Sequence, residues 1–239
     1  MILLLAAGYF FFHFQSEPKQ PAAKKNINYT YHIVALGDSL TQGVGDPKDQ
    51  GYVGLTAKGL KKEKQVRSVT VVNYGHMGDT TADLLNVVSR KNVQHSLRQS
   101  NTIFLTIGGN DIVEVLRAHF MDLHASDFTQ EQKTYAANLS HILAKVRSLN
   151  PRASIYFFGL YNPFEDYFGK ANKDFTPVLD RWNRQSIQIS KKYRVQFMPT
   201  AAIFKGKGDS LFYTDHFHPN KNGYEDMSAL LLRTIQENR

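Results

Sequence analysis

Five short apolar runs recur along the chain after residue 30, and most of them show no alternation between hydrophobic and polar positions. They are rich in β-branched and aromatic residues, which is typical of strands that are buried on both faces of a sheet. The runs are Tyr31–Gly37, Val69–Tyr74, Thr102–Ile107, Ser154–Phe158 and Val195–Met198. Between them, apolar side chains recur at helical spacing, as at 135–146, 178–189 and 224–235. Strands that alternate with helices predict an α/β fold with a five-stranded parallel sheet covered on both sides.

The first 14 residues follow another pattern. Ile2–Phe12 is an unbroken run of apolar or small residues with no basic residue before it. It is shorter than the roughly 20 residues that span a bilayer, and it matches the core of a signal peptide. No A-x-A cleavage site follows, so an uncleaved signal anchor is favoured over a cleaved signal peptide, with a buried N-terminal helix as a third alternative.

We therefore expect a signal anchor or signal peptide at 1–14, a polar linker at 15–28 and one globular domain at 29–239. This organisation predicts a domain outside the cytoplasm, either tethered to the cell membrane or secreted. The chain has no cysteine, which excludes disulfides, thiolate metal sites and cysteine nucleophiles. Its net charge of +8 indicates solvated basic faces or attraction to an anionic surface. Basic residues do not interleave with aromatic ones, so nucleic acid is not expected as a partner.

Four small motifs contain the candidate chemistry. Three of them follow predicted strands: GDSL at Gly37–Leu40, GHMGD at Gly75–Asp79 and GGND at Gly108–Asp111. The fourth, DHFHP at Asp215–Pro219, precedes the last predicted helix. Because ligands bind beyond the carboxyl ends of strands in an open α/β sheet, the first three motifs are expected at one edge. The G-x-S-x-G elbow of α/β-hydrolases is absent, since position 41 is threonine.

The residue types in these motifs fit acyl transfer. Ser39 lies on a strand-to-helix turn and needs a base to take its proton. The spacing between Asp215 and His218 lets the carboxylate orient one ring nitrogen while the other faces the serine. Gly78 lets a carbonyl approach its backbone N–H, and Asn110 can donate an amide N–H to the same point. With the N–H of Ser39, they would form an oxyanion hole.

The neighbouring polar residues have simpler interpretations. His216 is expected to point away from the serine, because it adjoins Asp215 in the turn. Asp38 and Asp111 stand at helix starts and are expected to act as caps. The remaining histidines are scattered without metal-ligand spacing, so no metal site and no cofactor are expected.

Together the four motifs resemble those of the SGNH hydrolase superfamily, the GDSL-type lipases, esterases and acylhydrolases. The resemblance runs from about Tyr31 to Arg239 and implies a flavodoxin-like three-layer α/β/α sandwich. It implies a Ser39–His218–Asp215 triad and an oxyanion hole formed by Ser39, Gly78 and Asn110. With its apolar N-terminal run, the chain is most similar to members that Gram-positive bacteria carry behind a membrane segment.

The substrate remains open among three alternatives. The first is a lipid or other acyl ester, cleaved through an acyl-enzyme by a lipase or acylhydrolase. The second is an O-acetyl group on a cell-surface carbohydrate, and the third is a non-catalytic binding module. The aromatic segment Tyr161–Phe175 follows the fourth predicted strand, so we expect it to form a mobile flap over an acyl groove. Within it, Tyr161, Phe164 and Phe168 are the expected substrate-binding residues.

Overall fold

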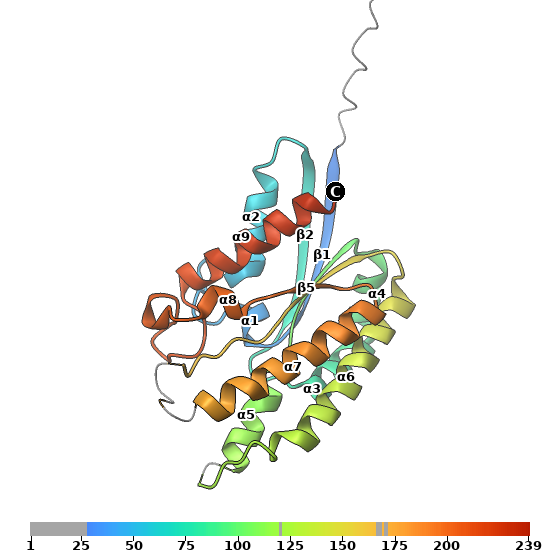
Figure 1. Ribbon diagram of the computed structural model, residues 1–239. Coiled ribbons are helices and arrows are strands. Elements are labelled where there is room, and N and C mark those ends of the chain that lie inside the picture. The colour runs from blue at the N-terminus through green and yellow to red at the C-terminus, as the bar shows by residue number, and fades with distance from the viewer. Residues whose placement is uncertain (1–27, 120, 166–168, 170–171) are drawn as a thin grey trace, which may run out of the picture.

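The structure, a computed structural model, describes residues 28–119, 121–165, 169 and 172–239 (Figure 1). The expected signal anchor or signal peptide at 1–14 and residues 15–27 of the expected linker lie outside these residues. No helix within the described part of the chain is long and apolar enough to cross a bilayer.

One parallel sheet organises the chain. Its strands are β1 Tyr29–Gly37, β2 Val66–Gly75, β3 Thr102–Thr106, β4 Ser154–Phe158 and β5 Gln196–Met198. They lie in the order β2-β1-β3-β4-β5, which is the flavodoxin-like order of doubly wound sheets. The predicted α/β fold with a five-stranded parallel sheet is therefore confirmed.

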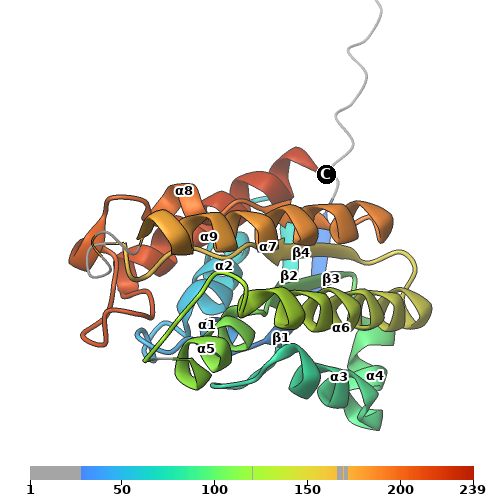
Figure 2. The same ribbon diagram turned by 60° about the horizontal axis from the view of Figure 1, so that its bottom comes forward.

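Helices cover both faces of the sheet. The helices are α1 Ser39–Gln42, α2 Gly51–Lys61, α3 Thr81–Ser89, α4 Lys91–Gln99, α5 Gly109–Ala118, α6 Phe128–Leu149, α7 Asn172–Lys192, α8 Ala201–Phe204 and α9 Lys221–Glu237, with a short 3-10 turn, η2, at Gly208–Ser210. One layer contains α2 and α9, and the other contains α3, α4, α6 and α7, with α6 beside α7 (Figures 1 and 2).

Side chains of β1 explain why two cores form. Ile33 and Ala35 pack into the cluster beneath α2 and α9. Val34 and Leu36 point to the opposite face and pack against α3, α4 and α6. Because successive strand side chains alternate between faces, an unalternated apolar run supplies both cores at once.

The two ends of β1 are far apart and different in character. Gly37 leads directly into the edge of the sheet that holds Ser39. Tyr29 lies at the opposite end, where the side chain of Arg239 stacks over its ring at 4.7 Å. The Arg239 guanidinium also donates to the hydroxyl of Tyr31 at 2.8 Å and pairs with Glu63. Arg239 thus holds the C-terminal end of the chain against the beginning of β1, at the end of the strand opposite Ser39.

Candidate active site

Ser39 occupies a tight turn between β1 and α1. The backbone of Gly37 has a φ of +137°, and a Cβ at that position would lie 2.0 Å from the carbonyl oxygen of Thr106. Only glycine fits that approach between β1 and β3. Asp38 then caps α1 by accepting the Leu40 N–H at 3.1 Å, as expected. The turn places the Ser39 side chain at the carboxyl edge of the sheet.

A buried hydrogen-bond network lies behind this turn. The Thr106 hydroxyl donates to Oδ1 of Asp38 at 2.7 Å and lies 2.7 Å from the Thr41 hydroxyl. The Tyr52 hydroxyl is 2.8 Å from Thr41. Burial raises the pKa of Asp38, and the hydrogen bonds from Thr106 and Leu40 oppose that shift. The network fixes the residue before the serine, and it was not predicted from the sequence.

The DHFHP motif forms a turn that presents a histidine to this serine. Oδ1 of Asp215 accepts the backbone N–H groups of Phe217 at 3.0 Å and His218 at 2.9 Å. The backbone of His216 is left-handed, with a φ of +54°, which lets the chain curl around the carboxylate. An isolated bridge between Phe212 and Pro219 closes the turn.

The same turn aligns three side chains. Nδ1 of His218 lies 2.6 Å from Oδ2 of Asp215, and Nε2 lies 2.8 Å from Oγ of Ser39. Burial opposes the ionisation of Asp215, but hydrogen bonds from the ring and backbone of His218 outweigh it and lower the pKa of that carboxyl. The carboxylate is therefore suited to hold the Nδ1–H tautomer of the ring, which leaves Nε2 free to accept from the serine. His216 is exposed on the same turn, and His218 is the one that contacts Ser39.

The loop after β2 leaves one N–H group for a ligand. The N–H of His76 donates to Gly37 O at 3.0 Å, and that of Met77 donates to the Gln42 side chain at 2.6 Å. The N–H of Asp79 donates to His76 O at 3.2 Å. Among the described residues, nothing accepts from the N–H of Gly78, which borders the cleft beside Ser39.

Asn110 comes from the start of α5 and is held in one orientation. One of its amide hydrogens is used by a 2.8 Å bond from Nδ2 to the carbonyl oxygen of Asp79. The second is left to face the cleft that Asn110 shares with Ser39. The neighbouring Asp111 does not cap its own helix: it accepts the backbone N–H and hydroxyl of Thr81, at the start of α3. That cap was placed on the wrong helix by the sequence pattern, because the acceptor reaches across to a different element.

Two hollows meet at Ser39. The first, here called the apolar cavity, has a volume of about 50 Å³ and runs between the sheet edge and α7. The second, here called the open cleft, has a volume of about 470 Å³. They share Ser39, Asn110, Val113, Phe164 and Phe217. His218 and Gly78 border the open cleft and do not line the apolar cavity.

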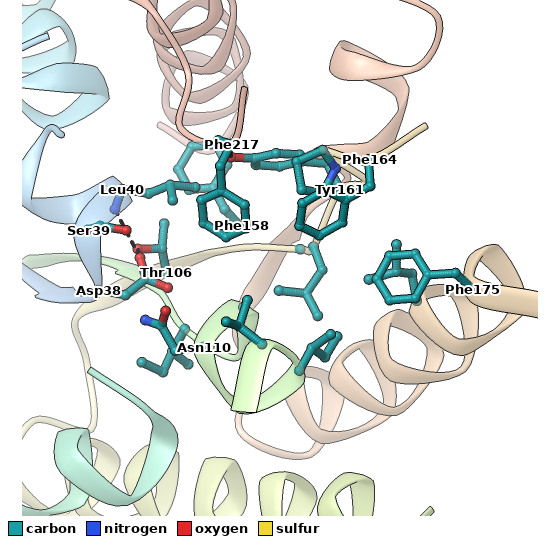
Figure 3. Close-up of a pocket in the computed structure, with 18 residues that line it drawn as sticks. Asp38, Ser39, Leu40, Thr106, Asn110, Phe158, Tyr161, Phe164, Phe175 and Phe217 are labelled. Atoms are coloured by element: carbon teal, nitrogen blue, oxygen red, sulfur yellow. Dashed lines mark hydrogen bonds between the residues drawn. The ribbon is translucent and has the colours of Figure 1, made fainter. Parts of the chain in front are cut away.

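The walls of the apolar cavity come from the helices α1, α5 and α7, from the ends of β3 and β4, and from the neighbouring loops. They include Leu40, Ile107, Ile112, Phe158, Leu160, Tyr161, Pro163, Phe164, Phe175, Leu179 and Phe217 (Figure 3). Figure 3 shows Phe175 at the end away from Ser39. The sequence analysis did not identify Phe158, Leu179 or Phe217 as residues of this cavity. Of the three, only Phe217 lies inside one of the four motifs, so only its position near Ser39 could have been expected.

Part of the aromatic segment after β4 packs against other parts of the protein. The ring of Tyr161 lies 4.2 Å from that of Phe204, and its hydroxyl donates to the carbonyl oxygen of Phe217 at 2.9 Å. Phe164 lies 5.8 Å from Phe217 and 6.1 Å from Phe175. Tyr161 and Phe164 both line the apolar cavity. Phe168 lies outside the described residues, and the motion expected of the flap remains a prediction.

Among the described residues, no group of three or more histidine, aspartate or glutamate side chains is placed to hold a metal ion. The arrangement instead joins a buried serine, a hydrogen-bonded histidine–aspartate pair and two N–H donors at the edge of a doubly wound sheet. A serine paired with a histidine and a carboxylate beside N–H donors is the arrangement that recurs, on several unrelated folds, in serine hydrolases.

Comparisons with known proteins agree. The model of the GDSL-like lipase/acylhydrolase family matches residues 35–225, and the chain belongs to that family. It is 34% identical over 225 residues to YpmR of Bacillus subtilis, covering 93% of this chain and 88% of that protein. It is 26% identical over 211 residues to the spore germination lipase LipC of Bacillus licheniformis, covering 84% and 95%. The lipase Lip_vut3 from a goat rumen metagenome shares the fold, with a TM-score of 0.71, 24% identity and coverage of 83% and 94%. The protein is thus a carboxylic ester hydrolase of the GDSL type.

Proposed function

We propose that Ser39 is the nucleophile of this ester hydrolase, with His218 as its base and Asp215 as the residue that orients the base. The observation that carries the proposal is the continuous hydrogen-bonded series from Asp215 through His218 to Ser39. Ser39 Oγ attacks the ester carbonyl carbon while Nε2 of His218 takes the hydroxyl proton. The negative charge that develops on the carbonyl oxygen is stabilised by the N–H groups of Gly78 and Ser39 and the amide of Asn110.

The second half of the reaction uses the same groups. The protonated His218 gives its proton to the leaving alcohol oxygen as the C–O bond breaks, which leaves an acyl group on Ser39. Water then attacks this acyl-enzyme while His218 takes a proton from it, and the carboxylic acid leaves as Ser39 regains its hydrogen. Water is the only co-reactant.

The substrate we propose is an ester with an unbranched acyl chain, held in the apolar cavity. The cavity is narrow and mostly apolar, which suits a row of methylenes better than a polyol. Tyr161 and Phe164 would contact the chain from the loop after β4, and Phe168 remains a proposed contact from the same segment. An O-acetyl ester of a carbohydrate is the second candidate, because the open cleft is large enough for a sugar.

The assignment of roles is tested with three alanine variants of the purified protein on a nitrophenyl ester. Ser39→Ala should remove nearly all turnover and all labelling by a serine-directed phosphonate. His218→Ala should lower kcat by about a thousandfold or more, as loss of a triad member does. His216→Ala is the matched control on the same turn and should cost less than tenfold. Equal losses for the two histidines, or turnover that survives Ser39→Ala, would contradict the assignment.

We further propose that residues 1–14 act as a signal anchor that places the domain outside the cytoplasm. The support is the apolar run Ile2–Phe12 followed by a polar linker. Protease added to intact cells should then digest the domain. If the domain resists until the cells are lysed, this location is wrong.

A further inference from the structure

The proposed reaction divides the site into two halves, which hold different parts of the same ester. His218 must deliver a proton to the leaving oxygen, so the alcohol part of the ester has to lie on the side that His218 borders. That side is the open cleft, since the apolar cavity has no contact with His218. The acyl part then occupies the cavity. The side chains of the cleft therefore decide which alcohols are accepted.

One face of α5 forms a wall of the open cleft. Asn110, Val113, Glu114 and Arg117 all line it, at helical positions i, i+3, i+4 and i+7. With a rise of about 1.5 Å per residue, Glu114 lies about 6 Å along the axis from Asn110, and Arg117 lies about 10 Å along it. The alcohol part of an ester that extends from Ser39 along this face passes Val113 and Glu114 before it meets Arg117.

Arg117 lies where its positive charge can bind an anionic group of a ligand. Its side chain is exposed in the cleft, and no carboxylate of the described residues lies within the 4.0 Å of an ion pair. Glu114 is one helical turn away and does not pair with it either. The planar guanidinium suits a phosphate or carboxylate, which it can bind through two parallel hydrogen bonds. Glu114, between Arg117 and the oxyanion hole, would repel an anion there and accept hydroxyl hydrogens instead.

We infer that the open cleft selects esters whose alcohol part is a polyol carrying an anionic group, with Arg117 binding the anion. The inference rests on the proposed function, because it takes the direction of the substrate from the role of His218. The anion would stand a few bonds from the ester oxygen, beyond hydroxyl groups that Glu114 can bind. Both a phosphorylated and a carboxylated polyol satisfy this chemistry.

Three hexanoyl esters with the same acyl chain test it: the ester of glycerol, of glycerol 3-phosphate and of glycerate. The wild type should hydrolyse at least one anionic ester with a kcat/KM at least tenfold above that of the neutral one. Arg117→Gln should reduce this ratio to about one, mainly through KM, while Arg117→Lys should retain part of it. The ratio for each anion tells whether phosphate or carboxylate is the group selected.

Arg67→Gln is the matched control, because Arg67 is an exposed arginine near the start of β2, away from the carboxyl edge. It lowers the net charge by the same amount and should leave the ratio unchanged. A wild-type ratio near one, or an equal drop in both variants, would overturn the role of Arg117. Failure of the proposed function looks different: the neutral ester would then be left intact, or its hydrolysis would survive Ser39→Ala.

Discussion

The size of the apolar cavity sets an expected dependence of activity on acyl chain length. The cavity volume is about 50 Å³, and a group of the size of a water or methylene needs about 10–15 Å³ of such space. The cavity therefore holds about four methylenes without rearrangement. Each buried methylene contributes about 0.8 kcal/mol, so four of them contribute about 3 kcal/mol. This corresponds to a rise in kcat/KM of about a hundredfold, and of about tenfold if the chain is only half buried.

The assay is a series of nitrophenyl esters from acetate to decanoate. We expect kcat/KM to rise from acetate to about hexanoate and then to level off. Leu179→Phe, which narrows the cavity from α7, should move the plateau to a shorter chain and leave acetate within about twofold. Thermal unfolding of the variant controls for overpacking, which costs about 1–3 kcal/mol in a filled core.

A flat profile, or a maximum at acetate, would refute the assignment of the apolar cavity to the acyl chain. The aromatic side chains of its wall would then serve the fold alone, and the O-acetyl candidate would be favoured. A plateau that does not move in Leu179→Phe would place the acyl chain elsewhere.

Three further variants test parts of the site. Asp215→Asn should lower kcat by about three to four orders of magnitude at neutral pH, because the amide no longer holds the required tautomer of His218; ester hydrolysis measures it. Thr106→Val should cost about 1–3 kcal/mol in urea unfolding, because Asp38 loses a buried donor; an unchanged midpoint would contradict the network. Gly78→Ala should still fold, because a Cβ there meets nothing within 4 Å, but its φ of +92° strains alanine by about 1–3 kcal/mol and should displace the N–H. The unfolding midpoint should therefore drop moderately, while kcat falls even at temperatures where the variant is fully folded.

The sheet could be predicted from the sequence because strands buried on both faces need apolar residues at every position. Ser154–Phe158 was predicted with its observed bounds, and the beginning of β2 was placed three residues late. The expectation of burial on both faces was wrong for β2, which is an edge strand: Val69 is its one buried residue, and Val71 and Val72 are exposed. The residues missed at its beginning, Val66 to Ser68, include polar side chains. Strand pairing with β1 keeps this part extended although its composition gives no sign of burial.

The candidate site could be predicted only where its residues form short motifs. The support from Tyr52 and Thr106 has no local signal, since it depends on how α2 and β3 pack behind the turn. Glu114 and Arg117 read as ordinary charged residues of an exposed helix. Only the position of α5 beside Ser39 turns this face toward the cleft, and that position is a property of the tertiary structure.

The separation between Tyr29 and Ser39 has a consequence for how the enzyme would meet its substrates. Nine residues of β1 place the two ends of the strand about 30 Å apart. Under the proposed anchoring, the membrane holds the end at Tyr29, so the catalytic edge faces outward. A linker of 14 residues reaches at most about 50 Å when fully extended. To reach esters in the same bilayer, the domain would have to rotate until its catalytic edge faced the membrane, within the reach of this linker. Dissolved esters that arrive from the medium would reach the site without such a rotation.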